Sequence, residues 1–116
     1  MKFRFELVTA RGSKVGCLIG GRGSTNVLLM HGNPSDAWVY ERFLAAAPED
    51  YRIAAINWYG KSERPWGGYT ASGFADQARD VMDALGMKTA SLGGHSLGGL
   101  AALIFAVSYP NPTMSW

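Results

Sequence analysis

The sequence predicts an α/β fold with a mostly parallel sheet and helices on both of its faces. Apolar runs of strand length alternate along the chain with segments of helical periodicity. The run at 26–30, NVLLM, has the composition of a strand buried on both faces. The chain has 116 residues, of which 47% are hydrophobic and 17% charged, as in a globular domain. We therefore expect about five strands and three helices in a single domain over residues 1–116.

The first elements are expected to be a hairpin and a buried strand. FRFELV, at 3–8, alternates apolar and charged residues, which is typical of a strand exposed on one face. KVGCLIG, at 14–20, is the next strand, and RGS at 11–13 suits a hairpin turn. GGRGST, at 20–25, is a turn that leads into the strand at 26–30.

The next element is expected to be a helix that ends near Pro48. Ser35 is the expected N-cap, because Pro34 prevents an earlier start. Trp38 and Phe43, with several alanines, give this helix its apolar side.

A buried strand at 51–57 and a loop at 58–69 precede the clearest helix of the sequence, from Ser72 to Leu85. Gly86 follows this helix at the position where a C-terminal glycine is favoured. Its apolar residues recur along one side, as in an amphipathic helix. They are Phe74, Ala78, Val81, Met82 and Leu85.

The last elements are a short strand at 88–93 and a helix at 97–109 that is apolar almost all round. In parallel sheets, ligands bind beyond the carboxyl ends of the strands. Three loops follow such ends here: HGNPS at 31–35, NWYGKS at 57–62 and GGHSLGG at 93–99. We expect these loops to meet at one edge of the sheet.

The glycine-rich segments of the chain match neither of two common phosphate-binding motifs. Dinucleotide sites need G-x-G-x-x-G between a strand and a helix, whereas GRGSTN, from Gly21, lacks the third glycine and precedes a strand. The P-loop needs G-x-x-x-x-G-K-[ST], but AINWYGKS has Ala55 at the first glycine, and no helix is expected after it. Nucleotide binding is therefore not expected.

Ser96 lies in the pattern G-x-S-x-G, which runs from Gly94 to Gly98 between a predicted strand and a predicted helix. Such a turn is tight and strained, so both flanking positions must be small and the serine is exposed. The helix N-terminus favours developing negative charge, and the Leu97 amide is an expected oxyanion donor. Chance occurrence in a glycine-rich chain is the alternative to a nucleophilic Ser96.

Three motifs together resemble the N-terminal portion of an α/β-hydrolase fold, over essentially the whole chain. LLMHGNPSDAW resembles the exit of the family's third strand, YRIAAINWYGKSERP that of the fourth, and GGHSLGGLAALIFAVSYP the nucleophile elbow and its helix. The resemblance implies a Ser–acid–His mechanism on ester-like or related small-molecule bonds, without a metal or organic cofactor. HGNP also resembles the dehalogenase and epoxide-hydrolase branch, whose nucleophile is an aspartate. Ser96 therefore favours the esterase, C–C hydrolase or perhydrolase side.

The resemblance also implies roles for single residues. Asn33 would supply the second oxyanion donor through its backbone amide, and a turn residue before proline is its alternative role. His31 would organise its loop by hydrogen bonding. The remaining candidate binding residues are Gly32, Trp58, Tyr59 and His95. The two aromatic residues could equally serve packing, and the side chain of His95 should point away from the reacting face.

The chain departs from the family pattern in two places. Asn57 stands where the family often has aspartate, and its loop is about two residues shorter than usual. No histidine or acidic residue follows Ser96, and the last acid is Asp83, whereas the triad order in this fold is serine, acid, histidine. We expect a serine hydrolase truncated before its acid and histidine. The alternatives are a non-catalytic binding module with a hydrolase-like fold, or a fragment without function.

Charge and cysteine content restrict the partners and the compartment. A net charge of +2 without a basic run gives no argument for nucleic acid. The single cysteine, Cys17, is an expected core residue and fits a reducing compartment. The longest uncharged apolar stretch, 97–107, is shorter than the roughly 20 residues of a membrane span. We expect a cytoplasmic protein with a small-molecule substrate. Self-association is expected if the strand before Ser96 is the sheet edge.

Overall fold

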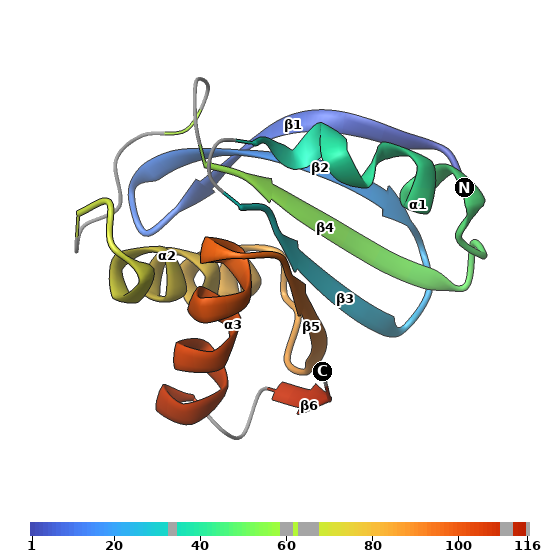
Figure 1. Ribbon diagram of the computed structural model, residues 1–116. Helices are drawn as coiled ribbons and strands as arrows, with labels where there is room; N and C mark the ends of the chain where they lie inside the picture. The colour runs from blue at the N-terminus through green and yellow to red at the C-terminus, as the bar shows by residue number, and fades with distance from the viewer. Residues whose placement is uncertain (33–34, 59–61, 63–67, 110–112, 116) are drawn as a thin grey trace.

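The computed structural model describes residues 1–32, 35–58, 62, 68–109 and 113–115. Within these residues the chain forms one six-stranded mixed sheet in the order β1-β2-β4-β3-β5-β6 (Figure 1). The strands are β1 (Phe3–Ala10), β2 (Ser13–Gly21), β3 (Thr25–Met30), β4 (Tyr51–Asn57), β5 (Ala90–Gly94) and β6 (Thr113–Ser115). The helical elements are a 3-10 turn, η1 (Ala37–Tyr40), and the helices α1 (Glu41–Ala46), α2 (Ala71–Ala84) and α3 (Leu97–Ser108).

The first two strands form the expected hairpin. β1 and β2 pair antiparallel, with Ala10 opposite Ser13. The two residues between them, Arg11 and Gly12, have φ values of 51° and 80°. Positive φ at both positions is the geometry of a two-residue turn that matches the twist of the strands. β2 pairs antiparallel with β4, and the pairs β4–β3, β3–β5 and β5–β6 are parallel.

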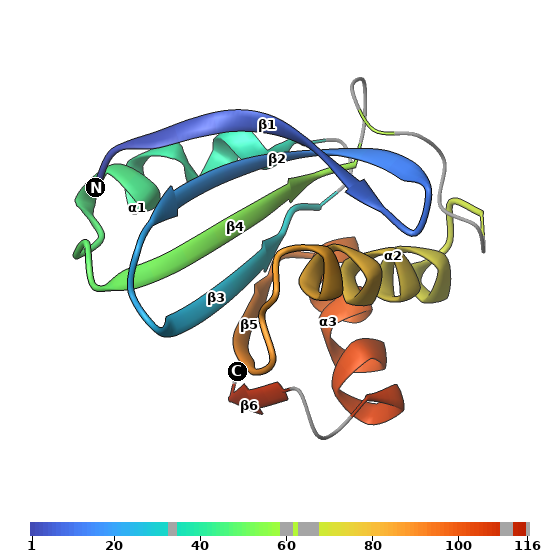
Figure 2. The ribbon, with the colours of Figure 1, turned by 180° about the vertical axis from the view of Figure 1, so that it is seen from behind.

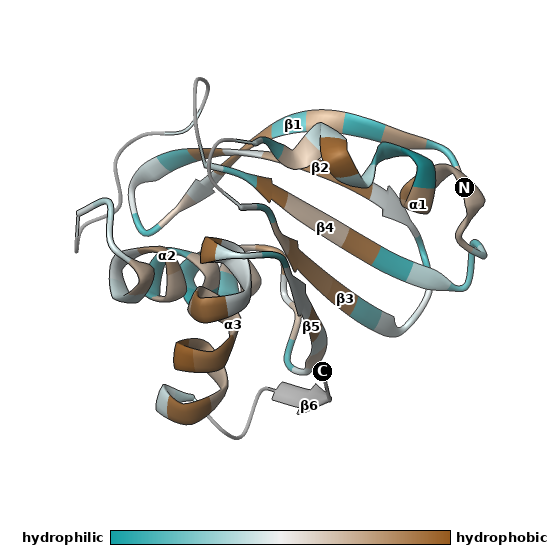
Figure 3. Ribbon diagram, in the orientation of Figure 1, coloured by the Kyte–Doolittle hydropathy of each residue, from teal (hydrophilic) through white to brown (hydrophobic). Residues whose placement is uncertain are grey.

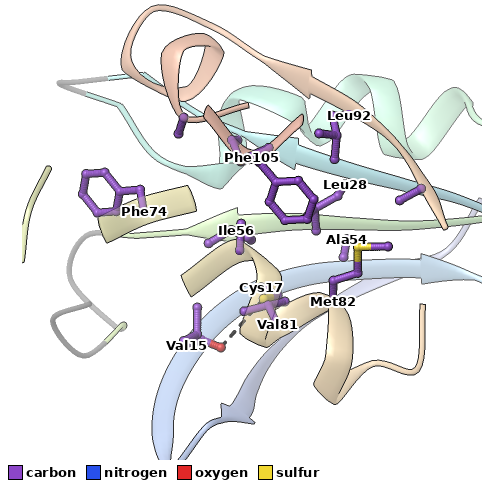
Figure 4. Packing of buried hydrophobic residues seen from close by; sticks show 14 of the residues in the cluster. Val15, Cys17, Leu28, Ala54, Ile56, Phe74, Val81, Met82, Leu92 and Phe105 are labelled. Atoms are coloured by element: carbon purple, nitrogen blue, oxygen red, sulfur yellow. Dashed lines mark hydrogen bonds between the residues drawn. The ribbon is translucent and has the colours of Figure 1, made fainter. Parts of the chain in front are cut away.

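Two apolar clusters cover the two faces of the sheet. Along β3, Leu28 and Met30 belong to the cluster under α2 and α3, whereas Leu29 belongs to the cluster under η1 and α1. α1 lies on the near face in Figure 1, and α2 lies on the near face in the opposite view of Figure 2. Figure 4 shows the larger cluster, with Phe105 of α3 and Met82 of α2 among its residues. The predicted arrangement, with helices on both faces, is confirmed.

α2 follows its predicted pattern closely. Thr70 caps its N-terminus, because its side chain accepts a hydrogen bond from the Gly73 amide. The helix ends at Ala84, and Leu85 is its C-cap, so Gly86 with its φ of 70° occupies the position after the cap, where glycine is favoured. Gln77, which the pattern places on the polar side, is buried as well. The buried side is wider than the apolar stripe because α3 packs beside α2.

The helix expected from Ser35 to Pro48 differs from its prediction. Its N-cap is Asp36, whose Oδ1 accepts a hydrogen bond from the Trp38 amide at 2.9 Å. The first turn is a 3-10 turn, which changes the phase of the residues that follow. The buried residues are therefore Ala37 and Leu44, and not Trp38 and Phe43, which the sequence predicted as the apolar side of the helix. Trp38 and Phe43 are 45% and 51% exposed.

The end of the chain adds a strand that the sequence did not predict. β6 pairs parallel with β5, so β5 is not the edge of the sheet. The outer side of α3 is nevertheless open to solvent, although Figure 3 shows that this helix is coloured largely as apolar. Its exposed apolar residues are Leu100, Leu103 and Val107, which we call the α3 stripe. Across the described part of the chain, no helix has the length and apolar character that crossing a membrane requires.

Candidate active site

The carboxyl ends of β4, β3 and β5 are neighbours in the sheet, so the residues that follow them meet. The Trp58 amide, after β4, donates a hydrogen bond to His31 Nε2, after β3, at 3.0 Å. The His95 amide, after β5, donates to the Met30 carbonyl at 3.2 Å. The expected meeting of three loops is thus confirmed for their described parts. Of the predicted site residues, Asn33 and Tyr59 lie outside the described residues.

Ser96 occupies a strained turn between β5 and α3. Its backbone has φ 56° and ψ −116°, a conformation that residues other than glycine rarely adopt. Such strain costs on the order of 1–3 kcal/mol, and it concentrates at functional sites. The residue is exposed, and none of the described residues hydrogen-bonds to its side chain. The hydroxyl therefore stands open above the edge of the sheet.

The glycines on both sides of Ser96 are required by close backbone contacts. A Cβ atom added at Gly94 would lie 2.4 Å from the Gly98 carbonyl oxygen. A Cβ atom added at Gly98 would lie 2.1 Å from the Met30 carbonyl oxygen. Both distances are too short for any side chain, because the atoms in the way belong to the backbone. These contacts give the G-x-S-x-G pattern a steric explanation in this chain.

The turn after β3 packs directly against the elbow through Gly32. A Cβ atom added there would lie 2.9 Å from the His95 carbonyl oxygen and 3.1 Å from the Ser96 Cβ atom. It would also lie 3.1 Å from His95 Nδ1, so the exposed His95 ring borders the same spot. The Leu97 amide is the first in α3, where the helix itself provides no acceptor. Gly32, His95 and Leu97 therefore all surround Ser96.

His31 organises this turn. Its side chain is fully buried, and its Nδ1 lies 2.7 Å from the Gly32 carbonyl oxygen. Because Nε2 accepts from the Trp58 amide, Nδ1 must carry the proton and donate. Burial lowers the pKa of the imidazole more than the Gly32 carbonyl and the charge of Asp36 raise it. Both ring nitrogens are thus engaged by backbone groups, which leaves neither to take a proton from Ser96.

Trp58 lies in the core and not on a pocket wall. Its side chain is 1% exposed, stacks on Phe74 at 4.2 Å and lies 5.3 Å from the His31 ring, measured between ring centroids. Its indole Nε1 is buried, and none of the described residues provides it with a hydrogen-bond partner. The candidate binding role of Trp58 finds no support in this position, and the packing alternative describes it. Its contribution to the site is the backbone amide that holds His31.

The residue at the unusual position 57 has a structural role. Asn57 is buried, and its Oδ1 accepts a hydrogen bond from the Ala37 amide at the start of η1, at 2.8 Å. An amide oxygen therefore provides the acceptor here, where the family often has a carboxylate. Asn57 thus ties the first residue of η1 to the end of β4.

Sequence reasoning missed Tyr40. Its hydroxyl donates a hydrogen bond to the Met30 carbonyl at 2.8 Å, which ties the last residue of η1 to the end of β3. No motif marks this residue. Its spacing of three from Ala37, which places both on one side of a 3-10 turn, is the only signal that the sequence offered.

Nothing in the described residues points to a metal site or to a reactive thiol. No three His, Cys, Asp or Glu side chains gather among them into a cluster that could hold a metal ion. Cys17 is buried in β2, and burial raises the pKa of its thiol to about 12. A thiol with this pKa is protonated near neutral pH and is therefore unreactive.

Comparison with known proteins gives consistent matches. A family model described as "alpha/beta hydrolase fold" matches residues 25–113. The chain is 32% identical over 99 residues to epoxide hydrolase 4 of Mus musculus. This alignment covers 82% of this chain and 28% of that protein. It is 31% identical over 96 residues to the bifunctional esterase/perhydrolase DCH of Acinetobacter calcoaceticus, covering 79% of this chain and 34% of that protein.

Solved structures resemble the whole described arrangement. E-2-(acetamidomethylene)succinate hydrolase superposes with a TM-score of 0.86 at 26% identity, over 97% of this chain and 42% of that chain. The epoxide hydrolase CorEH gives a TM-score of 0.87 at 23% identity, over 97% of this chain and 40% of that chain. This chain spans only 28% and 34% of the lengths of the two curated relatives named above.

Proposed function

Because the chain belongs to the α/β-hydrolase fold family, we propose that it contributes Ser96 as the nucleophile of a serine hydrolase. The proposed substrate class is an ester-like or related bond of a small molecule. The observation that carries this proposal is the strained, exposed Ser96 at the turn between β5 and α3. An exposed side chain on a strained backbone fits a reacting group better than a structural one.

The proposed chemistry is acyl transfer through the serine. The Ser96 oxygen attacks the substrate carbonyl carbon, and its proton passes to a general base. The resulting oxyanion accepts hydrogen bonds from the Leu97 amide and, as a further part of the proposal, from the Asn33 amide. The alcohol leaves with a proton from the base, and water then releases the acid and frees the serine. No metal or organic cofactor takes part in this scheme.

The general base and its acid partner are proposed to come from residues outside these 116. Among the two histidines of the sequence, His31 has both ring nitrogens engaged by the backbone. His95 precedes the serine in the elbow itself and borders Gly32. The family order of the triad places acid and histidine after the serine, and this chain spans only 28% and 34% of the lengths of the two relatives. A cytoplasmic location remains part of the proposal.

Covalent labelling in the presence of an added base tests the proposal directly. We would incubate the chain with a fluorophosphonate and increasing imidazole, which can accept the serine proton in the role proposed for a histidine. The Ser96 oxygen displaces fluoride from phosphorus, and the adduct is located by mass spectrometry of peptides. We expect an adduct on Ser96 whose rate of formation rises with imidazole concentration.

Two variants complete this experiment. Ser96→Ala should abolish the imidazole-dependent adduct. Ser108→Ala, at the exposed far end of the same helix, should leave it unchanged. A correctly folded chain without any adduct on Ser96, at every imidazole concentration, would reject the nucleophile. The non-catalytic binding module would then be the better account.

A further inference from the structure

The Met30 carbonyl, at the end of β3, joins three parts of the site. It accepts the His95 amide of the elbow at 3.2 Å and the Tyr40 hydroxyl of η1 at 2.8 Å. It also lies so close to Gly98 that a Cβ atom there would be 2.1 Å away. The position of this carbonyl group therefore sets how β3, the elbow and the start of α3 fit together.

Tyr40 provides the one side-chain contact among those described at this carbonyl. A carbonyl oxygen has two lone pairs, and here one faces the elbow amide while the other faces the tyrosine hydroxyl. The hydroxyl contact is the shorter of the two, so it is the better formed. Met30 is fully buried, which leaves water no access to replace the hydroxyl.

Tyr40 is itself held on two sides. Its ring packs against the apolar cluster under η1, and burial raises the pKa of its hydroxyl, which keeps it a donor. The first residue of η1, Ala37, is anchored by Asn57 at the end of β4. The turn η1 thus spans the exits of both strands, and Tyr40 transmits that placement to the Met30 carbonyl.

We propose that Tyr40 is a positioning residue for Ser96, acting through its hydrogen bond to the Met30 carbonyl. This inference rests on the proposed role of Ser96 as nucleophile. Without the hydroxyl, the carbonyl keeps only its bond to the His95 amide, and the peptide can rotate toward or away from Gly98. The elbow then loses a fixed distance to the turn at Gly32, which packs against the Ser96 Cβ atom. A displacement of about 1 Å at a reacting group can lower the rate of its reaction about a hundredfold.

The test compares Tyr40→Phe with Tyr51→Phe in the full chain. Both changes remove a phenol hydroxyl, but Tyr51 begins β4 at the opposite end of that strand. Saturation kinetics of fluorophosphonate labelling at a fixed imidazole concentration separate binding of the probe from the reacting step. We expect the limiting rate constant to fall about tenfold in Tyr40→Phe, with an unchanged half-saturating concentration. Tyr51→Phe should match the wild type in both.

A second measurement tests the role of Tyr40 without relying on the reactivity of Ser96. Amide hydrogen exchange, followed residue by residue with NMR, should become faster at His95 in Tyr40→Phe and stay unchanged in Tyr51→Phe. A limiting rate constant equal to that of the wild type would overturn the proposal, even if stability falls. If the wild type itself forms no adduct, the proposed function fails, and the exchange at His95 decides whether Tyr40 positions the elbow. Unchanged exchange there would overturn the inference as well.

Discussion

The buried imidazole of His31 accepts a hydrogen bond from the Trp58 amide across 3.0 Å, which joins the exits of β3 and β4. The same ring donates to the Gly32 carbonyl at 2.7 Å, directly beside the elbow that carries Ser96. Both contacts require the neutral imidazole with its proton on Nδ1. The protonation of one buried side chain therefore bears on the geometry of the whole site.

Lowering the pH should reduce the free energy of unfolding, because His31 becomes protonated. Burial lowers the pKa of this group in the folded chain below the ordinary 6.5, so the unfolded chain binds a proton more readily. The stability that neutral His31 contributes is present above pH 6.5 and is lost as the pH falls through 6.5 toward the folded-state pKa. Denaturant unfolding between about pH 7.5 and pH 5 should show this decline.

The matched variants for this prediction are His31→Gln and His95→Gln. The first should be less stable at neutral pH and should show a smaller decline on acidification. The second removes an exposed histidine and should follow the wild type. An unchanged pH dependence in His31→Gln would contradict the assignment of the decline to this ring.

The two glycines at the start of α3 should respond oppositely to alanine. Gly98→Ala places a methyl group against the Met30 carbonyl, so α3 must move away from β3. We expect a loss of about 1–3 kcal/mol or more in the free energy of unfolding. Gly99→Ala meets its nearest atom at 3.5 Å, an ordinary contact, and gains helix propensity of up to about 1 kcal/mol. Equal effects of the two changes on denaturant midpoints would contradict the close contact between Gly98 and the Met30 carbonyl.

The helix cap after β3 can be tested with neighbouring residues. Asp36→Ala removes the acceptor of the Trp38 amide and should destabilise the chain by about 1 kcal/mol. Ser35→Ala, one residue earlier, should change stability by less than about 0.5 kcal/mol. Thermal unfolding of both variants decides between the observed cap and the one that the sequence predicted. A larger loss in Ser35→Ala would restore the earlier prediction.

The α3 stripe should drive self-association of the isolated chain. Leu100, Leu103 and Val107 are 50%, 54% and 80% exposed, and α3 carries no charged residue to oppose contact between copies. We expect sedimentation velocity to show species larger than the monomer, increasing with concentration. Leu103→Lys combined with Val107→Lys should shift the distribution toward monomer. Trp38→Lys, on the opposite face, serves as the control, and an equal shift in it would contradict the role of the stripe.

Local pattern predicted most of the architecture in this chain, because burial follows periodicity in its strands and in α2. Leu28 and Leu29 point to opposite faces because they are neighbours in a strand, and Phe74 and Ala78 are buried because they are one helical turn apart. The same holds for the elbow, where the spacing of Gly94 and Gly98 around Ser96 encodes a local steric requirement.

What the sequence did not predict depends on contacts between distant segments. Ser35 and Asp36 are both good N-caps, and the choice between them depends on how η1 docks on Asn57. Tyr40 acquires its role only because the Met30 carbonyl lies within reach of it. β6 is too short for a periodic pattern and forms by pairing with β5. The packing of Trp58 against Phe74 likewise joins residues from a loop and a separate helix.

The backbone strain at position 96 sets stability against function in a single residue. Glycine adopts positive φ without a steric penalty, so Ser96→Gly would relax the turn that the serine holds under strain. A library of variants selected only for resistance to heat should therefore enrich glycine at this position. A library selected for turnover, in a protein that supplies the base, should return serine. The two selections would therefore favour different residues at position 96. The difference in their outcomes would measure how much activity the serine hydroxyl provides and how much stability it costs.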